Sequence, residues 1–329
     1  MGQYFRFANI DARETTEGAG NKLGEDIWTS KADLVILLMR NWTVAASSMD
    51  IWTHQSSAII QSKSSAKAKF LRLPNELIRA IFDEIDDLLS IIHLCVAHDI
   101  LGLVGEERLR ELFVPEPYGP WAGDRIICVG DYCESDSFPR DIQDEITAQL
   151  TAYAKTLVNP KYPPTFYGYV RSTYPYRTPP QLQLGSSIGW NRRMSNEDNS
   201  KVWEVEWAIR RVRVAADIKD PKLVLCNLTR GVYVRNDAVN EFRELVRAKV
   251  KWADISLGTV LFSRICWSTD SSCAMHSDLA ERLTHGDWAG DRFEIVPIDE
   301  VQPDIGWKDV TDEAMAWLRK NAELDLGIV

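Results

Sequence analysis

The sequence Trp-Ala-Gly-Asp-Arg occurs twice in this chain, at 121–125 and at 288–292, and its charged side chains could do chemistry. The two acid–base pairs are Asp124 with Arg125 and Asp291 with Arg292. Placed on either side of a pseudo-twofold cleft, they would bind a charged small molecule. Such a site also requires perturbed pKa values, which a sequence does not reveal.

The same two motifs also have a structural interpretation, which we favour. Trp121 and Trp288 would anchor a core, and Gly123 and Gly290 would take a positive φ in a turn. Each Asp would then accept backbone hydrogen bonds as it leads into a strand. Turn residues that occur in both copies are expected if both copies keep one fold.

The flanking sequences indicate an internal duplication of the chain. Three pairs of segments surround the motifs in the same order: 7–10 with 225–228, Arg13 with Arg230, and 141–145 with 309–313. Landmarks that recur in order are the signature of a repeat. The first copy also contains an insertion between Asn9 and Trp121 that the second copy lacks.

Composition excludes several classes of protein. The chain has 329 residues, of which 45% are hydrophobic and 26% charged, as in ordinary globular proteins. A net charge of −10 argues against nucleic acid as a partner. The six cysteines form no CxxC pair and no zinc-ligand spacing, so we expect no metal. Nucleotide-binding and nucleophile-elbow motifs do not occur, so we expect no cofactor and no catalysis.

Targeting signals and isolated nucleophiles add no further function. The chain shows no secretory signal and no apolar run long enough to cross a membrane, so we expect a cytoplasmic or nuclear protein. Cys273 and His276 share a polar loop, but a nucleophile pair also needs an orienting group and an oxyanion hole, and neither can be named.

The insertion at 70–115 has the pattern of three short amphipathic helices. Leu77, Ile81 and Ile85 recur at the spacing of one helix face, and Pro74 stands where a helix begins. A second helix follows Asp86, and a third spans 106–113. So many apolar positions in so few residues require a partner surface.

The insertion resembles an F-box, the helical module that docks on the adaptor subunit of cullin-based ubiquitin ligases. The Leu-Pro-Asn-Glu-Leu start at 73–77 and the Ile-Phe pair at 81–82 carry the resemblance. The resemblance implies these docking residues: Leu73, Pro74, Leu77, Ile78, Ile81, Phe82, Leu88, Leu89 and Ile92. The rest of the chain is similar to uncharacterised basidiomycete F-box-like proteins.

The fold class expected is α+β, with two related lobes and the three-helix insertion in the first. The predicted parts are a first lobe at 1–54 and 116–157, a linker at 55–69, the insertion at 70–115, a connector at 158–220 and a second lobe at 221–329. The main predicted helices lie at 32–40, 141–157, 237–252 and 312–324. Strands are predicted at 3–10 and 202–214, with a strand pair at 257–267.

The connector is rich in proline and tyrosine between 160 and 180. Proline at this density disfavours helices and central strands, so we expect either a plain link or a loop that recognises a peptide. Two functions follow. The first is a non-catalytic receptor that docks the ligase adaptor and presents an unknown client. The alternative is a small-molecule or enzymatic site in the lobes, with the helices as a lid or as an element that packs on the lobes.

Overall fold

The computed structural model describes residues 4–16, 18, 23–29, 31–40, 73–86, parts of 90–108, 119–134, 137–157, 163–177, 220–251, 253–270, 283–301 and 306–327. The chain divides into two compact units. The sheet unit contains residues 1–40, 118–178 and 218–329, and the helical unit contains 41–117 and 179–217. Both copies of the motif belong to the sheet unit, and the F-box-like segment belongs to the helical unit.

The first sheet is built mostly from the first half of the chain. It has the strand order β2-β1-β3-β6. Its members are β1 (Phe5–Asn9), β2 (Glu14–Thr15), β3 (Ile126–Gly130) and β6 (Cys266–Trp267). β1 runs antiparallel to β2 and β3, whereas β6 runs parallel to β3. All five residues of β3 are buried, as expected for a central strand covered on both faces.

The second sheet repeats the order of three of these strands in the second half of the chain, but its fourth strand pairs at the opposite end. Its strand order is β7-β4-β5-β8. Its members are β4 (Leu223–Asn227), β5 (Val232–Arg235), β7 (Phe293–Pro297) and β8 (Lys308–Asp309). Here β4 is the central antiparallel strand, and β8 pairs in parallel with β5. The strands β4, β5 and β7 thus correspond to β1, β2 and β3.

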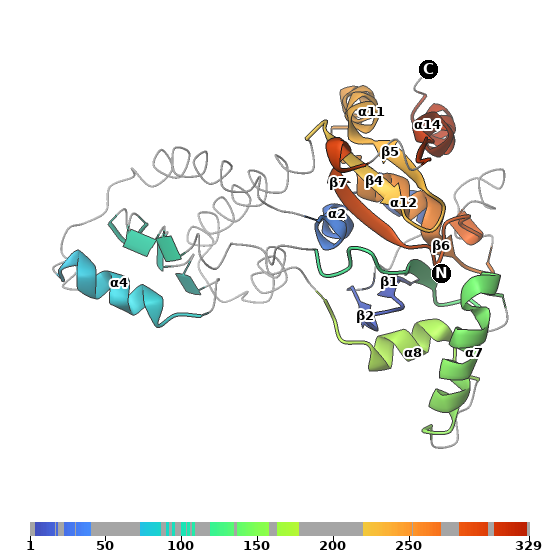
Figure 1. Ribbon diagram of the computed structural model, residues 1–329, viewed down its shortest axis with the longest axis horizontal. Coiled ribbons are helices and arrows are strands. Elements are labelled where there is room, and N and C mark those ends of the chain that lie inside the picture. The colour runs from blue at the N-terminus through green and yellow to red at the C-terminus, as the bar shows by residue number, and fades with distance from the viewer. Residues whose placement is uncertain are drawn as a thin grey trace. The chain divides into compact units, whose positions relative to one another are not determined.

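Each sheet also receives an extended segment from the other half of the chain. β6 directly follows helix α12 (Leu257–Ile265) and pairs with β3. Met39 directly follows helix α2 (Ala32–Leu38) and forms a parallel bridge with Ile295 in β7. This exchange joins the two predicted lobes into one compact unit, in which α2 and α12 lie beside the sheets (Figure 1).

Helices α7 (Arg140–Ala154) and α8 (Phe166–Thr173) cover one face of the first sheet. Apolar residues of both helices share one core with β3. The core residues they contribute are Ile142, Ile146, Leu150, Phe166, Tyr167 and Val170. Thr165 caps α8, because its hydroxyl accepts the backbone N–H of Gly168 at 3.1 Å. The short helix α1 (Leu23–Asp26) precedes α2.

Helices α11 (Asn236–Lys249) and α14 (Thr311–Leu326) contact each other and the second sheet. α11 buries Val239, Phe242 and Val246, which recur at three- and four-residue spacing on one helix face. α14 ends at Gly327, whose φ of 60° closes the last turn in the left-handed conformation. A 3-10 turn, η4 (Ile298–Glu300), follows β7.

The predicted α+β fold class is confirmed, and two element predictions are wrong. The stretch predicted as a strand pair at 257–267 forms helix α12, followed by the two-residue strand β6. All nine residues of α12 are buried, including Thr259, Ser263 and Arg264, so this helix has no exposed face. Its apolar run at 260–262 resembles a buried strand. Ser256 at its N-cap donates its N–H to the Thr259 hydroxyl at 3.1 Å.

The connector contains a helix where the prolines led us to expect none. Pro163 and Pro164 precede the cap of α8 and do not interrupt it. Tyr167 and Tyr174 are buried in the core, which argues against the recognition loop, one of the two interpretations of this segment. The predicted linker at 55–69 and the predicted strand at 202–214 lie outside the described residues.

The residue correspondence between the two halves also differs from the prediction. Arg13 has a φ of 54°, and Gly231 has a φ of 64°. The N–H of Ala12 donates to Asn9 Oδ1 at 2.9 Å, and the N–H of Arg230 donates to Asn227 Oδ1 at 3.1 Å. In both halves the donor is three residues after the Asn. Arg13 therefore corresponds to Gly231, and Arg230 corresponds to Ala12.

Candidate functional site

The two Trp-Ala-Gly-Asp-Arg turns have the same backbone geometry. The N–H of Ala122 donates to Gly119 O at 3.0 Å, and that of Ala289 donates to Gly286 O at 3.1 Å. The central glycines have φ values of 87° in the first turn and 83° in the second. The positive φ expected for both glycines is therefore present.

The two turns meet through direct backbone hydrogen bonds. Arg125 and Arg292 form an antiparallel bridge. The N–H of Gly123 donates to Phe293 O at 2.7 Å, and that of Gly290 donates to Ile126 O at 2.9 Å. Each turn is thus tied to the first residue of the other half's strand, so the pair forms the seam between the two sheets.

Each aspartate of the motif binds an asparagine side chain of its own half. Asn9 Nδ2 donates to Asp124 Oδ2 at 2.8 Å, and Asn227 Nδ2 donates to Asp291 Oδ2 at 2.8 Å. The backbone acceptance that we predicted for these aspartates is replaced by this contact. Each Asn–Asp pair links the end of the central antiparallel strand to the turn.

The motif tryptophans are buried, as predicted for core anchors. Trp121 is fully buried, and its indole N–H donates to Glu14 Oε2 at 2.8 Å. Trp288 is 4% exposed, and the guanidinium of Arg264 lies 5.0 Å from its ring centroid. A buried indole N–H needs a hydrogen-bond acceptor, so Glu14 also fixes the position of the Trp121 ring.

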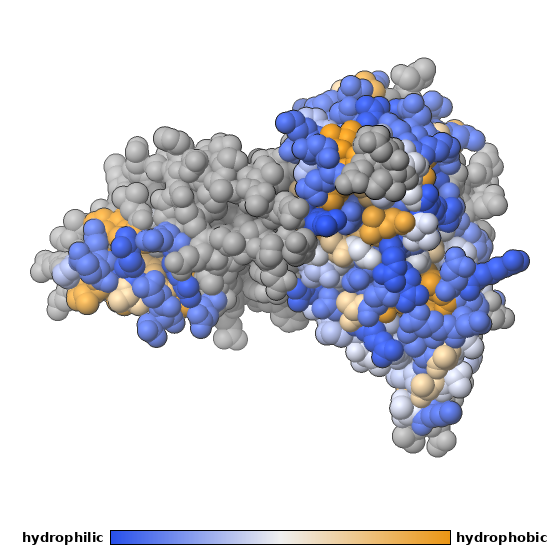
Figure 2. All heavy atoms as spheres, in the orientation of Figure 1, coloured by the Kyte–Doolittle hydropathy of each residue, from blue (hydrophilic) through white to orange (hydrophobic). Residues whose placement is uncertain are grey.

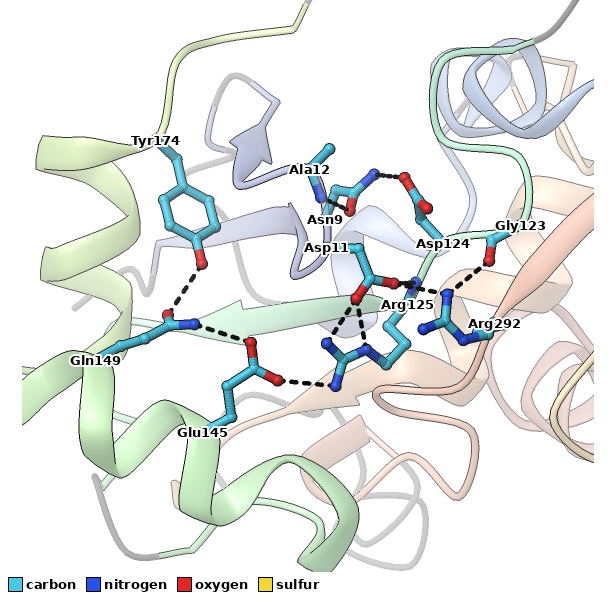
Figure 3. A network of polar contacts seen from close by, with 10 residues as sticks. All are labelled: Asn9, Asp11, Ala12, Gly123, Asp124, Arg125, Glu145, Gln149, Tyr174 and Arg292. Carbon is cyan, nitrogen blue, oxygen red and sulfur yellow. Dashed lines mark hydrogen bonds and ion pairs between the residues drawn. The ribbon is translucent and has the colours of Figure 1, made fainter.

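Asp11 connects the arginines of both turns (Figure 3). Its Oδ1 lies 2.6 Å from Arg125 Nη2, and its Oδ2 lies 2.8 Å from Arg292 Nη1. Arg292 Nη1 also donates to Gly123 O at 3.0 Å. The single carboxylate of Asp11 therefore joins a guanidinium from each half of the chain.

The network continues from Arg125 into helix α7. Arg125 Nη1 lies 2.9 Å from Glu145 Oε2, and Gln149 Nε2 donates to Glu145 Oε1 at 3.1 Å. Tyr174 Oη then donates to Gln149 Oε1 at 3.2 Å. Figure 3 shows this chain of contacts running from the seam to the end of α8.

The pKa values agree with these ion pairs. Burial alone would raise the pKa of the Asp11 carboxyl, but the hydrogen bonds and positive charges of Arg125, together with Arg292, lower it below its ordinary value of 3.8. The hydrogen bond to Asp11 raises the pKa of the Arg125 guanidinium. The charges of the turns thus stabilise one another, as in a structural network.

Sequence reasoning missed Asp11 and Glu145, which make most of the contacts of Arg125. Asp11 is hidden in the repeat comparison because Thr229 occupies the corresponding position. The Thr229 hydroxyl accepts the backbone N–H of Arg292 at 2.9 Å, just as Asp11 Oδ2 accepts that of Arg125 at 2.9 Å. Glu145 lies in the matched segment 141–145, and its acidic side chain was its only signal.

The predicted docking residues of the F-box-like segment divide into buried and exposed groups on helix α4 (Asn75–Asp83). Ile78 and Phe82 are fully buried, so they belong to the core of the helical unit. Leu77 is 52% exposed and Ile81 36% exposed, and Pro74 is exposed before the helix. Leu73 is half-buried. Leu88, Leu89 and Ile92 lie outside the residues whose side chains are described.

The segment that follows α4 also contributes buried residues. They include Ile91, Cys95, Leu101 and Val104. A Cβ added to Gly105 would lie 2.5 Å from the Phe82 ring and 2.6 Å from Cys95 Sγ, so the chain approaches Phe82 closely. Figure 2 shows apolar surface over α4 among polar side chains.

The described residues contain neither a metal-ligand cluster nor a membrane-spanning helix. These residues contain no group of three His, Cys, Asp or Glu side chains that could hold a metal ion. In the same part of the chain, the helices lack the length and apolar character needed to span a bilayer. Cys273 and His276, which were not predicted to act as a nucleophile pair, lie outside the described part.

No protein-family model, curated protein or solved structure matches the chain. The functional conclusions therefore rest on the residues and their geometry.

Proposed function

We propose that this protein is a non-catalytic receptor. Its F-box-like segment docks the adaptor subunit of a cullin-based ubiquitin ligase, and its sheet unit presents a client protein. Other subunits of the complex supply catalysis.

The exposed apolar stripe on α4 carries this proposal. Pro74, Leu77 and Ile81 follow one another at helical spacing, so they lie on one side of the helix. The neighbouring positions, Ile78 and Phe82, build the core beneath. The helix is therefore amphipathic with an extra apolar row that has no use inside its own unit, and a partner surface would bury that row.

The separation of the chain into two units also supports a docking role. The helical unit has its own buried residues, and ion pairs join its segments: Arg79 with Glu107 at 3.4 Å and Arg108 with Asp86 at 3.1 Å. A segment with its own core can bind a partner without rearranging the sheets. The sheet unit in turn is braced by the seam network around Asp11, which suits a rigid platform.

The alternative function, a charged small-molecule site at the seam, has less support. Its expected ligand-binding groups already have partners within the protein. Asp124 binds Asn9, and Arg125 and Arg292 both bind Asp11. A ligand would have to displace these internal partners.

The test is capture of the purified ligase adaptor by the full-length protein and by a Leu77→Asp/Ile81→Asp variant. Full burial of a leucine-sized side chain contributes about 1.5–3 kcal/mol, so loss of two half-exposed contacts should weaken binding at least tenfold. The matched control is Leu245→Asp/Leu324→Asp, because these leucines of α11 and α14 are 59% and 51% exposed.

The proposal expects binding by the wild type and the control, and loss in the α4 variant. Circular dichroism should give the same helical signal for all three proteins, since both pairs of substitutions are at exposed positions. Absence of binding by the folded wild type would contradict the proposal, and so would equal binding by the α4 variant.

A further inference from the structure

Cys128 and Cys266 are neighbours on paired strands that come from different halves of the chain. β3 and β6 run parallel, and their register places Cys128 opposite Cys266. Adjacent strands lie about 4.7–4.9 Å apart. This spacing falls within the Cα separation of about 4.4–6.8 Å that a disulfide spans.

Both thiols project to the same face of the first sheet. Ile127 and Val129 pack with α7 and α8, so Cys128 between them projects to the opposite face, beside α12. The Cys266 thiol donates to the Phe262 carbonyl of α12 at 3.0 Å, which places it on that face as well. Both cysteines are buried, and neither forms a disulfide.

A buried ammonium group lies near the two thiols. Lys31 is 5% exposed, and its Nζ lies 4.8 Å from the centre of the Phe262 ring. Lys31 Nζ also forms an ion pair with Asp26 at 3.2 Å, and burial lowers the pKa of Lys31 against the effect of this pairing. Disulfide exchange requires the thiolate, the form of a thiol that attacks a disulfide.

We propose that Cys128 and Cys266 form a redox-active dithiol that closes to a disulfide between the two halves of the sheet unit. One thiolate attacks a low-molecular-weight disulfide and releases one thiol, leaving a mixed disulfide. The second thiolate attacks the protein sulfur of that bond, forms the Cys128–Cys266 bond and releases the second thiol. Two electrons pass to the oxidant, and the two protons leave with the released thiols.

The position of β6 determines how an oxidant reaches the Cys266 thiol and what a Cys128–Cys266 disulfide would hold together. β6 is a two-residue strand whose other side pairs with residues 284–286, through Ser268 N–H to Thr284 O and Gly286 N–H to Cys266 O, both at 2.8 Å. Local opening of this short strand and its pairings would expose the Cys266 thiol. Because α12 ends at Ile265, next to Cys266, a disulfide would fasten both β6 and α12 to β3. The disulfide would therefore hold β6, which comes from the second half of the chain, covalently against β3 of the first half. This inference does not depend on the docking function.

The test treats the reduced full-length protein with oxidised glutathione under native conditions, followed by denaturation, alkylation and peptide mass spectrometry. Two of the six cysteines should resist alkylation, and a peptide pair linked through Cys128 and Cys266 should appear. Reduction should reverse both changes. Thermal unfolding of the oxidised protein should occur at a higher temperature than that of the reduced protein.

Two serine variants provide the controls. Cys128→Ser should lose no further thiol on oxidation, whereas Cys226→Ser, which replaces a buried cysteine of β4, should still form the linked peptide. The unfolding temperature of each reduced variant establishes that it is folded before treatment. Complete alkylation of Cys128 and Cys266 after native oxidation would overturn the inference, as would linkage of either residue to another cysteine.

Discussion

Arg125 and Arg292 pair with each other through their backbones, and one carboxylate, that of Asp11, binds both of their guanidinium groups. The two copies of the motif thus meet at one point and share one counter-ion. The two turns and the two Asn–Asp pairs have matching geometry, and β2, β1 and β3 are ordered as β5, β4 and β7 are. The two halves differ at the shared counter-ion, because Thr229 stands in the second half where Asp11 stands in the first.

Replacement of Asp11 by Asn should destabilise the sheet unit. The variant loses the ion pairs with Arg125 and Arg292, at 2.6 and 2.8 Å, on a side chain that is 22% exposed. We expect a loss of about 1–2 kcal/mol in the free energy of unfolding. Urea unfolding followed by tryptophan fluorescence measures it.

The matched control is Asp312→Asn. Asp312 pairs with Arg319 at 3.2 Å, but its side chain is 90% exposed, so the loss should be about 0–0.5 kcal/mol. Equal effects of the two substitutions would contradict a special role for Asp11.

The contribution of Asp11 should disappear at acidic pH. Its pKa is below 3.8 in the folded protein, so the unfolded state takes up a proton first as the pH falls. The stabilisation is therefore fully present above pH 3.8 and is lost as the pH falls through the lower folded-state pKa. The difference in unfolding free energy between wild type and Asp11→Asn should shrink from pH 5 to about pH 3. A difference independent of pH would exclude the ion pairs as its cause.

The motif glycines should respond unequally to alanine. Both have a positive φ, which costs an alanine about 1 kcal/mol. A Cβ at Gly123 would meet no atom within 4 Å, whereas a Cβ at Gly290 would lie 2.9 Å from Ile142 Cδ1 in the core. Gly290→Ala should therefore lower the unfolding temperature more than Gly123→Ala. The reverse order would mean that the two turns differ in conformation.

Local patterns predicted the helices whose polar and apolar faces are distinct. α7 and α11 begin within one residue of their predicted starts, because their apolar positions recur at helical spacing. α12 was predicted as strands because its apolar run shows no exposed polar face of helical period, since the whole helix is buried. The motif turns were predicted from their repetition alone.

Partners distant in sequence could not be predicted. The pairing of β3 with β6 and the binding of Arg292 by Asp11 depend on how the two halves exchange segments, and no local pattern encodes that exchange. On α4, the sequence predicted an apolar face but not which of its rows is buried. Leu77 and Ile78 are adjacent and both apolar, yet Leu77 is 52% exposed and Ile78 is fully buried.

Two other buried thiols should be unreactive. Burial raises the pKa of Cys133 and that of Cys226 to about 12, so both remain protonated at pH 8.5. Iodoacetamide should label them slowly in the native protein and completely in urea, as measured by peptide mass spectrometry. Rapid labelling of either residue in the native protein would mean that its surroundings open readily.

Hydrogen–deuterium exchange of the full-length protein, with and without the purified ligase adaptor, tests the docking surface on α4 most directly. If the adaptor docks on α4, the α4 amides (Asn75–Asp83) should exchange more slowly when it is added, and exchange in α11 (Asn236–Lys249) should be unchanged. Leu77→Asp/Ile81→Asp should abolish the protection of α4. Unchanged exchange in α4 at saturating adaptor would contradict the account.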